Sequence, residues 1–340
     1  MARSIGLVAV VLSIWLAPLA HAAEDEVRAG NFRPTAQHEI VPKGSTLEVL
    51  WAEGDFTEGP AAAPSGEIYF TDIGNRILRF DPRTSKVEGY REPSGRANGL
   101  AFDPLGRLIA CEGAWAGNRR ISITEKDGTV RTLAEAFEGK RFNSPNDLAI
   151  DSKGNVFFTD PRYAGEEKRE LDFEGVFRVT PEGKVTLATK AVEKPNGILV
   201  SPDGKTVYVS DSNSVTHGKR QLVSFVLRDD GTLTDKKVLY DFGLGRGIDG
   251  MTLDVDGNLY ATAGKEELAG IYVFSPVGKP LAFLPLPGDP TNCEFGRGDD
   301  AKSLYITARA PRPQKEGMPR KYALYRTTLA KAGYHGGQVK

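Results

Sequence analysis

The stretch N-G-I-L-V-S-P-D-G-K-T-V-Y-V-S at residues 196–210 decides the fold. It begins with a polar residue and a short apolar run, turns at Gly204, where a residue tolerant of positive φ is needed, and continues into a second β-rich run. The same order recurs along the chain at intervals of about 40 to 53 residues. The six units open at Glu58, Asn98, Asn146, Asn196, Asp249 and Asn292.

Each unit has the length of four strands. In the first five units a glycine follows the opening residue by eight positions, which places a tight turn between two strands. A third β-rich run and a weaker fourth run follow in most units, and no helical periodicity of useful length is present. This repeat predicts an all-β fold, a six-bladed β-propeller with four antiparallel strands per blade. A β-sandwich would not produce six units with a polar residue in register.

The sixth unit lacks a fourth strand after Ala323-Leu324-Tyr325-Arg326. The β-rich segment Leu47–Trp51, which precedes the first unit, has the composition to supply it. We therefore expect an N-terminal strand to close the last blade, and we place the propeller at residues 46–330. Residues 23–45 are an N-terminal extension and residues 331–340 a C-terminal tail.

The first residues differ from the rest of the chain. Arg3 is followed by an apolar run from Ile5 to Ala20 and by the small-residue pattern Ala20-His21-Ala22. This pattern predicts a signal peptide at residues 1–22, cleaved after Ala22 or Ala23, and export to the periplasm or out of the cell. A retained membrane anchor is the alternative, although the run is shorter than the ~20 residues that span a bilayer.

Composition narrows the classes of partner. The 44 Lys and Arg residues nearly balance the 45 Asp and Glu residues, so no strong field exists to attract nucleic acid or anionic lipid. A small neutral or weakly charged ligand fits better. The two cysteines, Cys111 and Cys293, are too few for a disulfide-built scaffold and are expected to be free and buried. The strand pattern marks no subunit interface, and the oligomeric state stays open.

In a propeller the first strand of every blade lines the central channel, so the six opening residues should gather around one axis. They offer carboxylate and amide oxygens, the donors that suit Ca²⁺. Mg²⁺, Mn²⁺ and Zn²⁺ stay possible, although no imidazole or thiolate opens a unit as a typical zinc site would require. A single Asn-Gly pair can serve only as a turn or cap. Two carboxylates, Glu58 and Asp249, are harder to place in a channel without a cation.

A second group of acids ends the second strands of four units: Asp72, Glu112, Asp160 and Asp211. These side chains could orient the ring residues through hydrogen bonds. For Asp72 and Glu112 we expect exposed strand ends instead. The four histidines lie outside the repeated register and no G-x-S-x-G segment occurs, so a Ser-His-Asp hydrolase is poorly supported.

Five segments resemble the signatures of the SMP-30/gluconolactonase/LRE family: T-E-G-P at 57–60, N-S-P-N-D-L at 143–148, F-T-D-P at 158–161, P-N-G-I at 195–198 and D-G-M at 249–251. The resemblance implies a six-bladed propeller that binds a divalent metal, often Ca²⁺, and in many members hydrolyses sugar lactones. Position by position, it makes Glu58, Asn196 and Asp249 metal ligands and Asp249 the acid/base. Asn146 would contact metal or substrate.

Substrate-contacting loops differ within this family. Candidates for such contacts are Asn98, Arg141, Asn143, Asn146 and Tyr163. The sixth unit departs from the pattern, with Cys293-Glu294 where small or apolar residues are expected beside the channel.

The sequence therefore predicts a metal-dependent hydrolase of sugar lactones. The cation would polarise the lactone carbonyl and Asp249 would act as general base. Two alternatives stay open. One is a non-catalytic, metal-stabilised propeller that binds a small molecule or a protein, and the other is an organophosphate or ester hydrolase that uses the same site.

Overall fold

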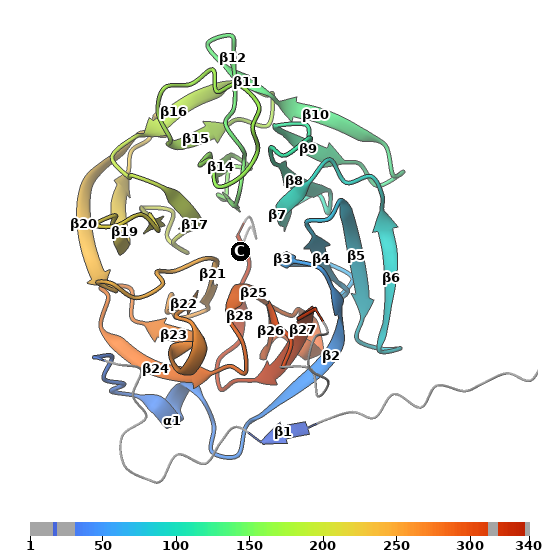
Figure 1. The fold of residues 1–340 in the computed structure, drawn as a ribbon, viewed down its shortest axis with the longest axis vertical. Coiled ribbons are helices and arrows are strands. Elements are labelled where there is room, and N and C mark those ends of the chain that lie inside the picture. The colour runs from blue at the N-terminus through green and yellow to red at the C-terminus, as the bar shows by residue number, and fades with distance from the viewer. Residues whose placement is uncertain (1–15, 19–30, 312–318, 337–340) are drawn as a thin grey trace, which may run out of the picture.

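The computed structural model describes residues 16–18, 31–311 and 319–336. These residues form a ring of six antiparallel sheets around a central axis, which confirms the predicted six-bladed propeller (Figure 1). None of the helices among them is long and apolar enough to span a bilayer.

The first five blades follow one another along the chain, each with its strands in order from the axis outward. Blade one contains β3 (Thr57–Ala62), β4 (Ile68–Asp72), β5 (Arg76–Asp81) and β6 (Lys86–Arg91). Blade two contains β7 (Ala97–Phe102), β8 (Leu108–Glu112), β9 (Arg120–Thr124) and β10 (Val130–Ala134). Blade three contains β13 (Leu148–Ile150), β14 (Val156–Thr159), β15 (Val176–Val179) and β16 (Val185–Thr189). Blade four contains β17 (Pro195–Val200), β18 (Thr206–Ser212), β19 (Arg220–Leu227) and β20 (Leu233–Asp241). Blade five contains β21 (Met251–Asp254), β22 (Leu259–Ala263), β23 (Gly270–Phe274) and β24 (Pro280–Pro285).

The sixth blade uses both ends of the propeller sequence. It contains β25 (Pro290–Phe295), β26 (Ser303–Arg309) and β27 (Tyr322–Thr328), and its outer strand is β2 (Thr46–Gly54). β2 runs antiparallel to β27, with Val49 opposite Tyr325, which confirms the predicted closing strand. β1 (Leu16–Pro18) pairs with β2. β1 falls within the predicted signal peptide, and the other residues of that segment lie outside the described ones.

Glycines after the ring positions let the inner strands approach one another. The backbone N–H of Gly99 donates to the carbonyl of Asn146 at 2.7 Å, and that of Gly197 donates to the carbonyl of Asp249 at 2.8 Å. A Cβ atom at Gly197 would lie 2.6 Å from the same Asp249 carbonyl. Only glycine permits this distance, so the Asn-Gly pairs serve close packing around the axis and not turns.

Apolar side chains fill the space between neighbouring blades. Between blades two and three, for example, Phe142 packs edge-on against Phe158 and Phe158 stacks on Phe177. Cys111 belongs to this same cluster, and Cys293 lies in the cluster between blades five and six. Both cysteines are free and buried, as predicted.

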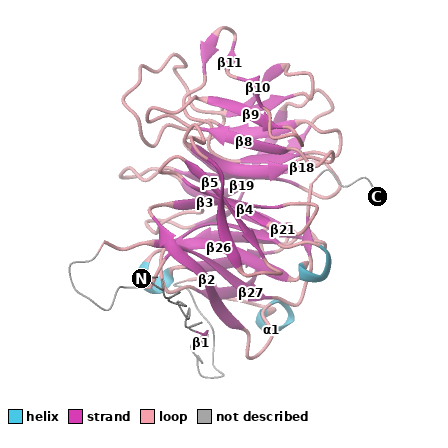
Figure 2. Ribbon diagram, turned by 90° about the vertical axis from the view of Figure 1, so that its right-hand side faces the viewer, coloured by secondary structure: helices cyan, strands magenta, loops and turns pink. Residues whose placement is uncertain are grey.

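The segments before and after the propeller pack onto it. Helix α1 (Gln37–Ile40) is held by two hydrogen bonds of 2.9 Å between the Gln37 amide and the backbone of Phe283. β28 (Gly333–Tyr334) pairs with the inner strand β21, and His335 behind it is buried. Figure 2 shows the ring from the side, with α1 and β2 at its lower end. Tyr334, His335 and Gly336 line a cavity at the end of the channel where the inner strands finish. The tail therefore closes one end of the channel.

Short elements in the loops complete the fold. β11 (Ala136–Phe137) and β12 (Lys140–Arg141) form a separate pair that projects from the ring between blades two and three (Figure 1). The 3₁₀ turns η1 (Glu266–Leu268) and η2 (Gly298–Asp300) lie in loops of blades five and six. We call the face that carries η1 and the loops before each inner strand the mouth.

Candidate functional site

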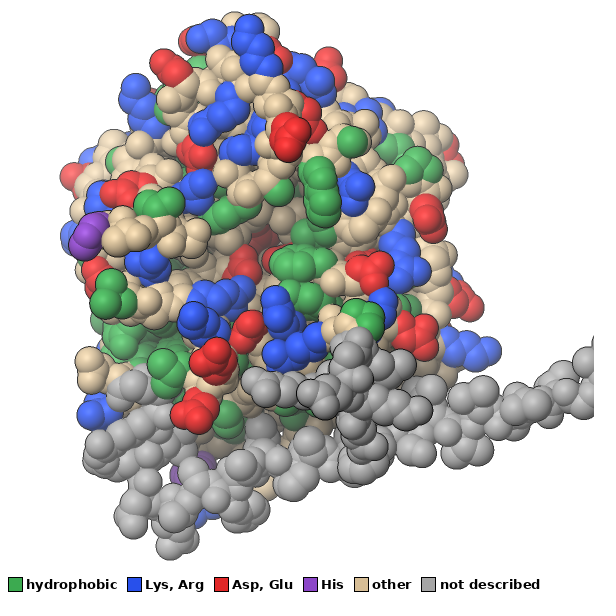
Figure 3. All heavy atoms as spheres, in the orientation of Figure 1, with side chains coloured by type: hydrophobic (Ala, Val, Ile, Leu, Met, Phe, Trp, Pro, Cys, Tyr) green, Lys and Arg blue, Asp and Glu red, His purple; other side chains and the backbone are tan. Residues whose placement is uncertain are grey.

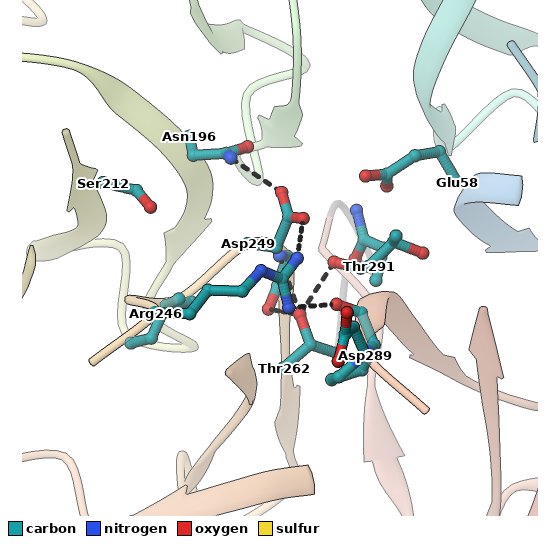
Figure 4. Close-up of polar contacts among 12 residues, drawn as sticks. Glu58, Asn196, Ser212, Arg246, Asp249, Thr262, Asp289 and Thr291 are labelled. Atoms are coloured by element: carbon teal, nitrogen blue, oxygen red, sulfur yellow. Dashed lines mark hydrogen bonds and ion pairs between the residues drawn. The ribbon is translucent and has the colours of Figure 1, made fainter. Parts of the chain in front are cut away.

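Three of the predicted ring residues converge on the axis at the mouth. Glu58 comes from β3, Asn196 from β17, and Asp249 from the loop that leads into β21. Figure 4 shows the three side chains directed toward one central space. The amide nitrogen of Asn196 donates to Oδ1 of Asp249 at 2.7 Å. The pairing register of the inner strand shifts just after Glu58 and around Asn196, and bulges of this kind turn the ring side chains toward the axis.

Asp249 has a cationic partner that the sequence did not reveal. Arg246 Nη2 donates to Asp249 Oδ2 at 2.5 Å, while Arg246 Nη1 donates to the carbonyl of Pro290 at 2.6 Å and to that of Gly264 at 3.2 Å. Arg246 belongs to the loop between β20 and β21, where no repeat register applies. The one available signal was a basic residue three positions before a ring carboxylate, in G-R-G-I-D-G-M.

Glu58 has no such partner. Its side chain is only 5% exposed, and Oε2 accepts one hydrogen bond, from the backbone N–H of Gly59 at 3.1 Å. No Lys, Arg or His in the described part of the chain forms an ion pair with it. Burial, and then the negative charge of Asp249, raises the pKa of Glu58 well above its usual value. Burial also raises the pKa of Asp249, against the lowering effects of Arg246 and Asn196.

This arrangement fits a hard divalent cation. The buried carboxylate of Glu58 and the partly buried carboxylate of Asp249 repel each other, and a cation between them would make their approach favourable. The amide nitrogen of Asn196 donates to Asp249, so the amide oxygen of Asn196 is the atom that could coordinate a cation. Within the described ranges no group of three or more His, Cys, Asp or Glu side chains is arranged to hold a metal. Any cation here would therefore depend on two carboxylates together with amide oxygens, a donor set that suits Ca²⁺.

The other ring asparagines differ in their surroundings. Asn146 is partly exposed, and its backbone is fixed by a hydrogen bond from its N–H to the carbonyl of Thr159 at 2.9 Å. Asn98 is also partly exposed, in β7. Asn292 is buried, its Oδ1 accepts from the backbone N–H of Cys293 at 2.8 Å, and its side chain bonds the carboxyl of Asp147. Asn292 is therefore a structural residue of the channel wall. The side chains of Asn98 and Asn146 remain partly exposed and accessible to a ligand.

The second group of acids holds the loops that carry the ring. Asp160 accepts from the backbone N–H groups of Asn143 and Ser144, each at 2.7 Å. Asp211 accepts from those of Glu193 and Lys194, and Asp72 from those of Asp55 and Phe56. In each case the carboxylate binds the loop just before the inner strand of its own blade. These acids thus position the ring through the backbone of the loops.

The expectation that Asp72 and Glu112 are exposed strand ends was wrong. Asp72 is 1% exposed and Glu112 is fully buried. Glu112 forms ion pairs with Arg91 at 3.0 Å and with Arg120 at 2.8 Å. The strand pattern could not reveal this, because the arginines come from other strands and reach the carboxylate only in the folded blade.

The predicted substrate contacts lie in different environments. Tyr163 is 45% exposed at the mouth, and its hydroxyl donates to the carbonyl of Ser212 at 3.1 Å. Arg141 is exposed, on the hairpin that projects from the ring, and it bonds the carbonyl of Asn118. Asn143 is fully buried, and its amide nitrogen donates to the carbonyls of Asp160 and Phe173. These three contacts stay predictions, and the environment of Asn143 is that of a structural residue.

The mouth is the open end of the channel. Figure 3 shows a hollow near the centre of this face, with acidic side chains inside it. Below the ring the channel narrows to a cavity of about 90 Å³, lined in part by Asp147, Glu294 and Arg297 and by the tail residues Tyr334 and His335. A ligand of the ring residues would therefore enter from the mouth.

Comparisons with known proteins identify the family of the propeller. The model of the family described as SMP-30/Gluconolactonase/LRE-like region matches residues 56–310. Gluconolactonase from Zymomonas mobilis is 30% identical over 297 residues, which cover 79% of this chain and 80% of that protein. Diisopropyl-fluorophosphatase from Loligo vulgaris is 28% identical, over 79% of this chain and 86% of that protein.

A solved structure of a gluconolactonase from Xanthomonas campestris is similar to this chain, with a TM-score of 0.73 and 27% identity. The match covers 89% of this chain and 99% of the other. Both the family match and the fold thus extend over most of the described propeller. The chain belongs to the SMP-30/gluconolactonase/LRE family.

Proposed function

We propose that this protein is a hydrolase of lactones and that a divalent cation, with Ca²⁺ favoured, acts at the axis. Glu58, Asn196 and Asp249 would hold the cation, and Asn146 would complete the set. The observation that carries the proposal is the convergence of a buried carboxylate, Glu58, and a partly buried one, Asp249, beneath an open mouth, with no ion pair formed by Glu58 among the described residues. The relatives named gluconolactonase support lactones as the substrate class.

Lactone hydrolysis adds water to an ester carbonyl and opens the ring to a hydroxy acid. A bound cation supplies Lewis-acid polarisation of the carbonyl oxygen. Asp249 is the residue we assign as general base, because amide side chains cannot accept a proton near neutral pH. Its two oxygens are oriented by Asn196 and Arg246, and each keeps a lone pair for a water proton. Burial raises the pKa of Asp249 above its usual value, against the lowering effects of Arg246 and Asn196.

The test combines a pH-stat assay on glucono-δ-lactone with Ca²⁺ titration by calorimetry. Asp249→Asn retains an oxygen that can meet a cation but removes the base, so turnover should fall by about 10²-fold or more while some Ca²⁺ binding persists. Asp256→Asn, which changes an exposed carboxylate in a turn between β21 and β22, is the matched control and should keep full activity. Near-wild-type turnover by Asp249→Asn with the metal still bound would remove the base assignment.

Metal dependence is tested separately. Exhaustive EDTA treatment should abolish turnover, and added Ca²⁺ should restore it. Full activity in protein verified to be metal-free would refute the cation's role.

Organophosphate hydrolysis at the same site is the second candidate, because a relative is named diisopropyl-fluorophosphatase. The same cation could polarise a P=O group as well as a C=O group. A panel of lactones and fluorophosphates assayed with one preparation distinguishes the two. Absence of turnover on both classes, together with a Ca²⁺-dependent rise in melting temperature, would instead indicate a binding protein with a structural cation.

We also propose that the chain is exported and that residues 1–22 are removed. N-terminal sequencing of the mature protein should then begin at Ala23 or Glu24. A mature chain that still carries Arg3 would refute cleavage.

A further inference from the structure

A second hollow opens at the mouth beside the ring. It is a cleft of about 1020 Å³ between three loops: the one that joins β20 to β21, the one that contains η1, and the one that joins β24 to β25. Its lining includes Arg246, the residue that binds Asp249. The cleft and the ring therefore share a wall, and a molecule bound at the ring can extend into the cleft past Arg246.

Large apolar side chains line this cleft. Leu244, on the loop after β20, is 91% exposed, and Leu268, at the end of η1, is 43% exposed. The floor is aromatic: Phe242 packs edge-on against Tyr240 and against Tyr272, with ring centroids 4.9 Å and 5.3 Å apart. Figure 3 shows hydrophobic side chains on this part of the face, with charged ones beside them. Apolar side chains that gather in one groove, rather than singly on a surface, are typical of a ligand-binding site.

The walls of the cleft are fixed before any ligand arrives. The hydroxyl of Tyr272 donates to the carbonyl of Leu268 at 2.8 Å, which ties the end of η1 to β23. Oδ1 of Asp289 accepts from the backbone N–H of Glu266 at 3.1 Å, which ties the start of η1 to the loop before β25. A preformed apolar surface loses little conformational freedom on binding. Most of the favourable free energy of burying a ligand there therefore contributes to affinity.

The size of the cleft exceeds what a single sugar lactone needs. Pockets of about 300–1,000 Å³ hold ligands the size of a drug molecule, and a hexonolactone bound at the ring would leave this volume empty. Charged side chains also line the cleft, so that apolar and charged surfaces share it; they belong to Asp241, Arg246, Lys265, Glu266, Glu267, Asp289 and Arg320. An apolar group with its reactive end at the ring matches this distribution.

We propose that the cleft binds an apolar substituent of the substrate, so that the preferred lactones carry an alkyl chain on the ring carbon next to the ring oxygen. The inference rests on the proposed lactone hydrolysis and specifies its substrate class. The reaction stays a hydrolysis: water adds, the acyl–oxygen bond breaks, and the product is a hydroxy acid whose chain leaves through the cleft.

Two exposed aromatic residues extend the apolar character of the mouth. Trp115, in the loop between β8 and β9, is 58% exposed and packs under the guanidinium of Arg96 at 4.8 Å. Tyr163, in the loop after β14, is also exposed. Both belong to blades two and three, across the axis from the cleft in Figure 1. Neither residue lines the cleft, and the proposal depends on Leu244 and Leu268.

The experiment measures kcat/KM on γ-lactones whose alkyl chain lengthens from methyl to octyl, with glucono-δ-lactone for comparison. Each methylene that enters the cleft should raise kcat/KM by about three- to four-fold until the cleft is filled. Leu244→Gln and Leu268→Gln should each reduce the ratio of kcat/KM between the longest and shortest lactone by about five-fold or more. Leu105→Gln changes a leucine that is 61% exposed in the turn between β7 and β8, away from the cleft, and should leave the ratio unchanged.

A binding measurement separates recognition from turnover. The γ-lactams with the same chains are not hydrolysed under these conditions, and their Kd by calorimetry should fall with chain length in the wild type and less steeply in Leu244→Gln. A flat dependence on chain length, or a preference for a lactone that carries a second sugar, would overturn the proposal while leaving lactone hydrolysis intact. No turnover of any lactone would instead refute the proposed function.

Discussion

Replacing Glu58 with glutamine should change the stability of the protein in opposite directions with and without Ca²⁺. Glutamine has the shape of glutamate but no charge. In metal-free protein at pH 8 the unfolded chain ionises Glu58 freely, whereas the fold raises its pKa by holding it in a 5%-exposed position next to a second carboxylate, with one hydrogen bond from Gly59. Each pKa unit by which burial raises this group corresponds to about 1.4 kcal/mol. We therefore expect Glu58→Gln to be more stable than the wild type in EDTA, by about 1–2 kcal/mol.

Added Ca²⁺ should reverse this order. A cation bound only by the folded state stabilises the wild type by about 2.7 kcal/mol at one hundred times its Kd. Glu58→Gln lacks one of the two carboxylates of the ring and should gain much less. Urea unfolding, followed by tryptophan fluorescence in EDTA and in millimolar Ca²⁺, gives all four free energies of unfolding.

The stability measurements have one control variant and two results that would contradict the reasoning. Glu88→Gln alters a carboxylate of the same blade that is 57% exposed and pairs with Arg79 on the outer surface. It should respond to Ca²⁺ as the wild type does. If Glu58→Gln is destabilised in EDTA as well, the carboxylate makes a favourable contact without metal. If it keeps the full Ca²⁺ response, Glu58 does not hold the cation.

Three further outcomes follow from the geometry. Gly197→Ala should lower the free energy of unfolding by about 1–3 kcal/mol because its Cβ would meet the Asp249 carbonyl at 2.6 Å, whereas Gly89→Ala, with open space around it, should be near neutral in the same urea assay. Asp211→Ala should cost about 1–3 kcal/mol and reduce kcat/KM by about ten-fold, since the backbone N–H groups of Glu193 and Lys194 lose their acceptor; unchanged kcat/KM would show that the loop needs no anchor. Burial raises the pKa of Glu294 to about 7, so the unfolded chain ionises first and this group should contribute a loss of about 2–3 kcal/mol in metal-free protein as the pH rises from 4.5 to 7, beside the losses from Asp147 and Asp160, whose pKa burial also raises to about 7. Glu294→Gln should flatten that loss, and an equal slope in both proteins would contradict the assignment.

The fold could be predicted from the sequence because the features that determine it recur at regular intervals along the chain. A turn glycine recurs in the first five units and a β-rich run in all six, and the missing fourth strand of the last unit pointed to Leu47–Trp51, which lies in β2. The same register correctly brought Glu58, Asn196 and Asp249 to one space.

What the sequence could not predict lies outside the repeat or depends on contacts between distant strands. Arg246 stands in a loop of irregular length, and only the folded chain brings its guanidinium to Asp249. The role of the buried acids was predicted only in part. Asp211 was expected to orient the ring, but its hydrogen-bond partners are backbone N–H groups, which residue types alone do not identify. His335 looked like part of a tail and is instead buried in the channel. In each case the contact depends on loop or tail backbone whose course the repeat does not determine.

The joining of β2 to β27 has a consequence for how the chain acquires its structure. Glu48 and Arg326 form an ion pair at 2.7 Å across this last pairing, although almost the whole propeller sequence separates them. During synthesis β2 emerges early and its pairing edge stays vacant until β27 has been made. Pairings between such distant segments form late and slowly, and an unpaired edge invites association with other chains in the interval. Refolding should therefore be slow and sensitive to protein concentration, with the ring closed last.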